Sequence, residues 1–142
     1  MKNIYLQIPL NTPDISNMVL ATVTVSEGST PQKPGSSALF SQSGLIAGTI
    51  GGGVLEGRVQ QIAQESLFSK KPVHYTFRLD NSVSNGEDAL CGGKISILID
   101  PELSGHISAF EALRKSCEAR TPGVLITLVT KGESDKVLIN RY

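Results

Sequence analysis

Apolar and polar residues alternate along several stretches of this chain, and this alternation predicts β-strands. In the run 19–25, Val19, Ala21, Val23 and Val25 occupy every second position, so one side of that strand is expected to be buried. Runs 37–40 and 45–50, separated by a short polar connection that ends at Gly44, predict a hairpin. The same reasoning predicts further strands at 73–79, 94–99, 124–130 and 136–139.

Helical spacing of apolar residues predicts two helices. One follows the triple glycine 51–53, has an apolar side and ends at Lys70-Lys71-Pro72. The other begins at Ser104 as its N-cap and ends near 121–123, and Cys117 on its apolar side is expected to be buried. These elements predict one α+β domain over residues 1–142, with a mixed, largely antiparallel sheet of about six strands covered by two main helices.

Composition and charge narrow the classes of partner. The chain has 142 residues, of which 39% are hydrophobic, and 13 basic residues balance 13 acidic ones. The chain has no cluster of positive charge of the kind that binds nucleic acid, so a nucleic-acid partner is not expected. The longest apolar run, 45–50, is far shorter than the roughly 20 residues of a membrane-spanning helix, so no membrane association and a cytoplasmic location are expected. Cys91 and Cys117 lack CxxC spacing, which indicates neither a disulfide framework nor a zinc site.

Three glycine-containing motifs carry the candidate chemistry. They are Glu27-Gly28-Ser29-Thr30-Pro31 with Pro34-Gly35, then the run from Gly48 to Glu56 (GTIGGGVLE), then Cys91-Gly92-Gly93-Lys94. In this order and spacing they resemble the amino-terminal domain of the XdhC/CoxI family, the xanthine dehydrogenase accessory proteins. The resemblance covers roughly residues 19–100.

This resemblance implies a function. A member of the family is expected to be a cytoplasmic bacterial factor that binds molybdenum cofactor transiently and protects it while a terminal sulfur is installed. It then delivers the cofactor to an apo molybdenum hydroxylase of the xanthine dehydrogenase type. Such a protein is a cofactor-insertion chaperone, more a carrier than an enzyme, and a cysteine desulfurase is a further partner that the resemblance implies.

The chain departs from the family pattern at two points. Longer members carry a carboxy-terminal Rossmann-type domain, whereas no GxGxxG motif opens a βαβ unit here, so nucleotide binding is not expected. Because the chain stops directly after a predicted strand, we expect a larger protein to continue beyond it. The loop after Pro31 has Gln32 where the family often has arginine, which leaves Lys33 as the nearest cation.

The resemblance makes several residues candidates for cofactor binding, and each has a simpler structural alternative. At Gly51, Gly52 and Gly53, exposed backbone N–H groups at a helix start favour an anion such as the pterin phosphate, but a tight turn would also need glycine. Glu56 either accepts from the pterin N–H groups or only stabilises the helix start. The remaining candidates, from the loops on either side, are Ser29, Lys33, Gly92 and Gly93.

Cys91 is the candidate metal-contacting residue. A thiolate in a glycine-flanked loop beside Lys94 suits molybdenum or transferable sulfur, whereas a small apolar side chain under the loop is the structural alternative. If Cys91 turns over sulfur, the chain is instead a thiol-dependent sulfur-transfer or redox enzyme. A purely structural or docking role is a third interpretation, and pairing through the apolar edge near Val124 would give a homodimer.

Overall fold

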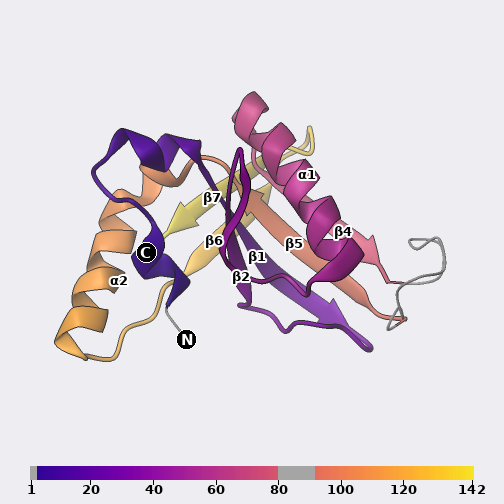
Figure 1. Cartoon of the computed structure of the whole chain (residues 1–142), viewed down its shortest axis with the longest axis horizontal. Coiled ribbons are helices and arrows are strands. Elements are labelled where there is room, and N and C mark those ends of the chain that lie inside the picture. Colours follow the sequence, from indigo (N-terminus) through magenta and orange to yellow (C-terminus); the bar gives the residue numbers. More distant parts are fainter. Residues whose placement is uncertain (1–2, 80–91) are drawn as a thin grey trace.

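The computed structural model describes residues 3–79 and 92–142 and shows two antiparallel sheets (Figure 1). The larger sheet has five strands in the order β3-β2-β1-β5-β4, and the smaller sheet pairs β6 with β7. Every pairing in both sheets is antiparallel. The strands are β1 (Met18–Glu27), β2 (Ser37–Ser41), β3 (Gly44–Gly48), β4 (Val73–Arg78), β5 (Lys94–Asp100), β6 (Thr127–Lys131) and β7 (Val137–Arg141).

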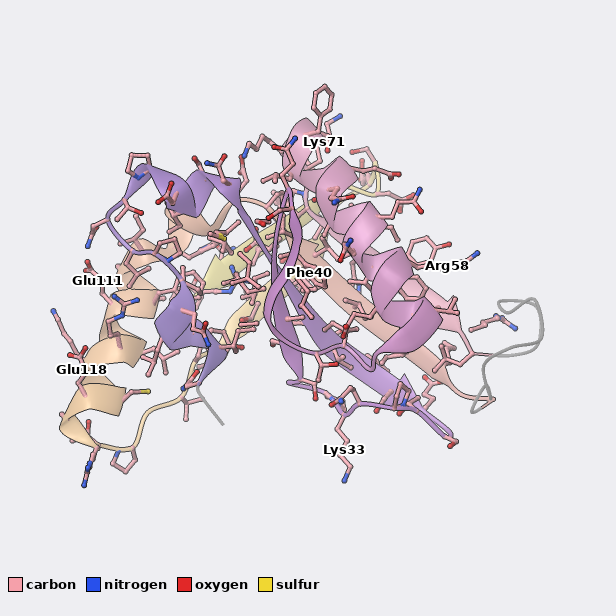
Figure 2. All side chains as sticks on the ribbon, in the orientation of Figure 1. Lys33, Phe40, Arg58, Lys71, Glu111 and Glu118 are labelled. Carbon is pink, nitrogen blue, oxygen red and sulfur yellow. The ribbon has the colours of Figure 1, made fainter. Side chains whose placement is uncertain are left out.

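Helix α1 (Gly53–Ser69) covers one face of the larger sheet (Figure 1). Its apolar side, which includes Leu55, Val59 and Ala63, packs against alternate residues of the central strands. Phe40 of β2 is fully buried in this core and lies beside α1 in Figure 2. The helix ends at Lys70, which adopts a left-handed conformation with φ of 54° just before Pro72.

The opposite face is covered by the amino-terminal segment and by α2 (Ile107–Ala119). The segment folds into two short 3₁₀ helices, η1 (Ile4–Gln7) and η2 (Pro13–Asn17), and a third, η3 (Leu103–His106), leads into α2. Their apolar side chains meet Leu20 and Leu39 from the sheet in a second core. The members of this core are Ile8, Leu10, Ile15, Leu20, Leu39, Leu103 and Phe110.

The α+β prediction with two main helices is confirmed, and three details differ. The strands divide into two sheets, so β6 and β7 do not extend the larger sheet. Ser104 lies in η3, and His106 is the N-cap of α2, because a 3₁₀ turn precedes the α-helix. Cys117 is half-buried, and the Asn3 side chain donates to its Sγ over 3.6 Å, so the prediction of a buried core residue was wrong.

The β6–β7 hairpin exposes apolar side chains on its outer surface. Ile126, Leu128, Leu138 and Tyr142 are all exposed, and Val124, just before the hairpin, is 82% exposed. Homodimer formation near Val124 stays a prediction. Neither α1 nor α2, within the ranges 3–79 and 92–142, has the length and apolar character that crossing a bilayer requires.

A buried ion pair ties the hairpin to the larger sheet. Arg141 of β7 donates to Asp100 at the end of β5, and both side chains are only 1% exposed. Asp100 also accepts from the Glu102 backbone N–H over 2.9 Å, and its Oδ2 lies 3.9 Å from His106 Nε2. The Arg141 guanidinium stands 5.4 Å from the centre of the Phe110 ring, at cation–π distance. The last strand is therefore held to β5 and α2 at one point.

Both histidines make stability depend on pH in the same direction. Burial lowers the pKa of His106, and Arg141 lowers it further against the opposite effect of Asp100 and Glu102. Burial also lowers the pKa of His74, with a smaller contribution from Lys131. The unfolded chain then binds protons more readily than the folded chain does. The free energy of unfolding should therefore have its full value above about pH 6.5 and decrease as the pH falls toward the lowered pKa values of the two histidines.

Urea denaturation between pH 7.5 and 5 measures this dependence. The double variant His74→Gln, His106→Gln should give a flatter profile than the wild-type chain in the interval below pH 6.5. The Gln side chain can still pair with Thr24 Oγ1, which lies 2.8 Å from His74 Nε2. Parallel profiles for the two proteins would show that the histidines do not cause the loss.

Candidate functional site

The glycine loops identified in the sequence meet at one end of the larger sheet. There β1 ends at Glu27, β5 begins at Lys94 and α1 begins at Gly53, and Figure 1 shows the end of β1 and the start of β5 on the same side of the molecule. The loop 28–36 lies between the other two. A Cβ at Gly51 would stand 2.6 Å from the Pro31 ring, and a Cβ at Gly93 would stand 2.0 Å from the Ser29 carbonyl oxygen. These glycines therefore allow the three loops to pack together.

Glu56 closes the loop that precedes α1. Its half-buried carboxylate Oε2 accepts from the Thr49 hydroxyl over 2.8 Å, from the Ile50 N–H over 3.1 Å and from the Gly52 N–H over 3.4 Å. Thr49 Oγ1 in turn accepts from the Gly51 N–H over 3.1 Å. Gly52 has a φ of 72°, which only glycine adopts without strain at this N-cap.

This arrangement gives the donors of the triple-glycine loop an internal acceptor. The N–H groups of Ile50 and Gly52, which a bound anion would need, already donate to the Glu56 carboxylate. A carboxylate at a helix N-terminus is also favoured by the helix dipole. The geometry thus supports the structural interpretation of Glu56, while cofactor contacts at Gly51, Gly52, Gly53 and Glu56 stay predictions.

Replacing Glu56 by Ala should destabilise the domain by about 1–3 kcal/mol, because it leaves polar N–H groups of a partly buried loop without an acceptor. Glu56→Gln keeps one side-chain oxygen and should cost less than half as much. Chemical denaturation of the two variants measures the difference. Equal stabilities for Glu56→Ala and the wild-type chain would show that the carboxylate does not hold the loop.

Of the other predicted residues, Ser29 and Gly92 lie near Gly93, whereas Lys33 points away from the glycine loops. Ser29 is exposed, and its carbonyl faces Gly93. Lys33 projects into solvent away from the ribbon (Figure 2), so it does not point toward the other loops. Gly92 is exposed, with open space where a Cβ would lie. Cys91 lies outside the described residues, so its role as the metal-contacting residue stays a prediction.

A row of charged residues beside Gly92 and Gly93 was not foreseen from the sequence. Across the sheet, Glu27 of β1 is opposite Lys94 of β5, and Lys94 is opposite Arg78 of β4. Lys94 Nζ forms an ion pair with Glu27 Oε2 at 3.1 Å. Predicting Arg78 would have required the register of β4 against β5. In the described part of the chain, no three His, Cys, Asp or Glu side chains gather to hold a metal ion.

Comparison with known proteins shows that part of this site lies within a family segment. Residues 16–79 match the XdhC and CoxI family. A probable xanthine dehydrogenase subunit of Bacillus subtilis (strain 168) is 29% identical over 140 residues, which are 97% of this chain and 42% of that protein. The uncharacterized protein YqeB of Escherichia coli (strain K12) is 36% identical over 83 residues, which are 56% of this chain and 15% of that protein.

The fold is also found in a solved structure. The crystal structure of a xanthine dehydrogenase from Bacillus halodurans superposes with a TM-score of 0.65 at 27% sequence identity, over 84% of this chain and 35% of that one. The chain thus spans less than half the length of each of these three relatives.

Proposed function

Since the chain carries an XdhC and CoxI family segment over residues 16–79, we propose that it is a molybdenum cofactor-binding accessory protein of a xanthine dehydrogenase system. In this role it binds the cofactor, shields it and delivers it to a molybdenum hydroxylase. The observation that carries the proposal is the similarity to the probable xanthine dehydrogenase subunit of Bacillus subtilis, which extends over 97% of this chain.

The end of the sheet where the glycine loops meet offers features that suit such a cofactor. Gly92 has open space beside its backbone there, and Lys94 and Arg78 supply positive charge next to it. The pterin part of the cofactor carries a phosphate, and cations beside open backbone favour a phosphate. The cofactor, when bound, would bring the molybdenum chemistry, and the chain's own residues would bind it.

Retention of released molybdenum cofactor tests the proposal directly. The purified chain is mixed with cofactor freed from a molybdenum enzyme, separated from unbound material and oxidised, and the pterin fluorescence of the protein fraction is measured. We expect close to one pterin per chain. An absence of pterin at micromolar protein would contradict a carrier function for this chain. Repeated sulfur transfer by the chain alone would instead indicate the thiol-dependent enzyme.

The two cysteines provide a matched pair for the same assay. If Cys91 contacts molybdenum or carries its sulfur, Cys91→Ala should weaken cofactor retention tenfold or more, which is about 1.4 kcal/mol. Cys117 lies on α2 and is only half-buried, so Cys117→Ala should leave retention unchanged. Equal retention by both variants would remove Cys91 from the proposed site.

A further inference from the structure

Two cations lie directly opposite each other at the end of the larger sheet. Lys94 of β5 pairs with Arg78 of β4, and cross-strand partners have side chains on the same face. Both alternate with residues that face α1, namely Ile95 and Phe77, so both lie on the other face of the sheet. Like charges in this position repel each other. An anion between or beside them would remove that repulsion.

Within residues 3–79 and 92–142, Glu27 forms an ion pair with Lys94 but not with Arg78. Its Oε2 pairs with Lys94 Nζ at 3.1 Å, and both side chains of the pair are about half exposed, at 59% and 45%. Such an exposed pair contributes little to stability, so Glu27 serves to fix the position of Lys94 more than to neutralise the whole row. Arg78 is exposed and offers a planar fork of donors that matches an oxyanion.

An open depression of about 320 Å³ lies over this row. It is lined by Glu27, Gly28, Arg78, Gly92, Gly93 and Lys94. Three of these six residues are glycines, and a Cβ at Gly92 would meet no atom within 4 Å, so the depression is open at this residue. The Gly92 N–H itself donates to the Leu79 carbonyl over 2.7 Å, which leaves the side chains of Arg78 and Lys94 as the donors to a ligand. The depression lies at the small end of the range for ligand sites, and it suits one group of a ligand better than a whole cofactor.

We propose that Arg78 and Lys94 bind the phosphate group of a phosphate monoester in this depression, beside Gly92 and Gly93. The inference rests on the proposed function, in which that monoester is the pterin of the molybdenum cofactor. It assigns the phosphate to the side chains of Arg78 and Lys94, because backbone N–H groups of both glycine loops already have acceptors. Those of Ile50 and Gly52 donate to Glu56, and that of Gly92 donates to the Leu79 carbonyl over 2.7 Å. Arg78 is the specificity-determining residue, since its fork can bind two phosphate oxygens at once.

Titration with inorganic phosphate at low ionic strength tests the site without the cofactor. The amide signals of Gly92 and Gly93 are followed by NMR in the full chain. Arg78→Gln should weaken binding roughly tenfold or more, whereas Glu27→Gln should strengthen it severalfold, because it frees Lys94 and removes a negative charge. Lys115→Gln, which removes an exposed cation from α2, is the control for net charge and should leave binding unchanged.

These outcomes separate the phosphate site from the proposed function. Absence of phosphate-dependent shifts at Gly92 and Gly93, or equal binding by Arg78→Gln and Lys115→Gln, overturns the site. If phosphate binds as expected but no pterin is retained from released cofactor, the site is supported and the carrier function fails. If Arg78→Gln retains the cofactor as well as the wild-type chain does, the carrier function is supported and the phosphate assignment is overturned.

Discussion

Replacing Arg141 by Met is expected to destabilise the domain by about 3–5 kcal/mol, the range for breaking a buried ion pair by removing one partner. Asp100 is 1% exposed, and without Arg141 its carboxylate would remain buried 3.9 Å from His106, a side chain whose lowered pKa makes it a poor counter-charge. The substitution would weaken contacts between three elements, because Arg141 joins β7 to β5 and also stands over the Phe110 ring of α2.

A double-mutant cycle shows how much of that cost belongs to the unpaired charge. Asp100→Asn with Arg141→Met removes both charges and keeps the Oδ1 acceptor for the Glu102 N–H. The double variant should be more stable than Arg141→Met alone, since replacing both members of a buried pair is often close to neutral. Arg141 Nε has no hydrogen-bond partner among the described residues, so Met leaves fewer buried donors unsatisfied. Additive losses in urea denaturation would contradict this explanation.

The elements with strong periodicity were predicted well from the sequence. The helix expected at the triple glycine is α1, which begins at Gly53 and ends at Ser69 with Lys70 as its C-cap, as Lys70, Lys71 and Pro72 indicated. The central strands lie close to where the alternation predicted them, and β5 is buried at six of its seven residues. The expectation that Val25 shares the buried side of β1 was wrong, because the pairing of β1 with β5 shifts between Val23 and Val25 and Val25 is 42% exposed. Periodicity predicts α1 because a helix packed on one face of the sheet has one apolar side, whereas β1 contributes to a core on each face of the sheet.

The amino-terminal 3₁₀ helices could not be predicted in the same way. Ile8, Leu10 and Ile15 do not follow a helix or strand period, yet all three are buried in the second core. Their burial depends on tertiary contacts with Leu20 and Phe110, which lie far away in the sequence. For the same reason β6 begins only at Thr127: Val124 and Ile126 are apolar but exposed, and the hairpin lies outside the larger sheet.

The candidate site was predicted as a set of loops but not as a set of contacts. The glycine positions pointed to loops that the structure brings into contact, with Gly51 against Pro31 and Gly93 against Ser29. The donors to Glu56 could not be read from the sequence, because they depend on the path of residues 49–52. Lys94 and Arg78 lie opposite each other because of the register of β4 against β5. From a single sequence, only the pattern of buried residues in each strand constrains that register.

Gly93→Ala is expected to destabilise the domain by about 3 kcal/mol or more, at the upper end of the range for overpacking. Its Cβ would stand 2.0 Å from the Ser29 carbonyl oxygen and 2.7 Å from that of Glu27, and these backbone atoms cannot move aside as a flexible side chain can. Gly93 also accepts from the Leu79 N–H over 2.8 Å, so a shift of this residue would disturb the pairing of β4 with β5.

The neighbouring Gly92→Ala is the matched control for this close approach. Gly92 has a φ of 70° but open space around a new Cβ, so it should lose only the roughly 1–2 kcal/mol that a left-handed conformation costs an L-residue. Thermal melts of the two variants therefore compare the cost of a steric clash, at Gly93, with the cost of a left-handed backbone conformation, at Gly92. Gly93→Ala should also weaken binding of inorganic phosphate, since Gly93 lines the depression next to Arg78 and Lys94. A Gly93→Ala variant as stable as Gly92→Ala would mean that the loops 28–36 and 92–93 do not pack together. The shape of the depression that holds the proposed phosphate site would then be wrong.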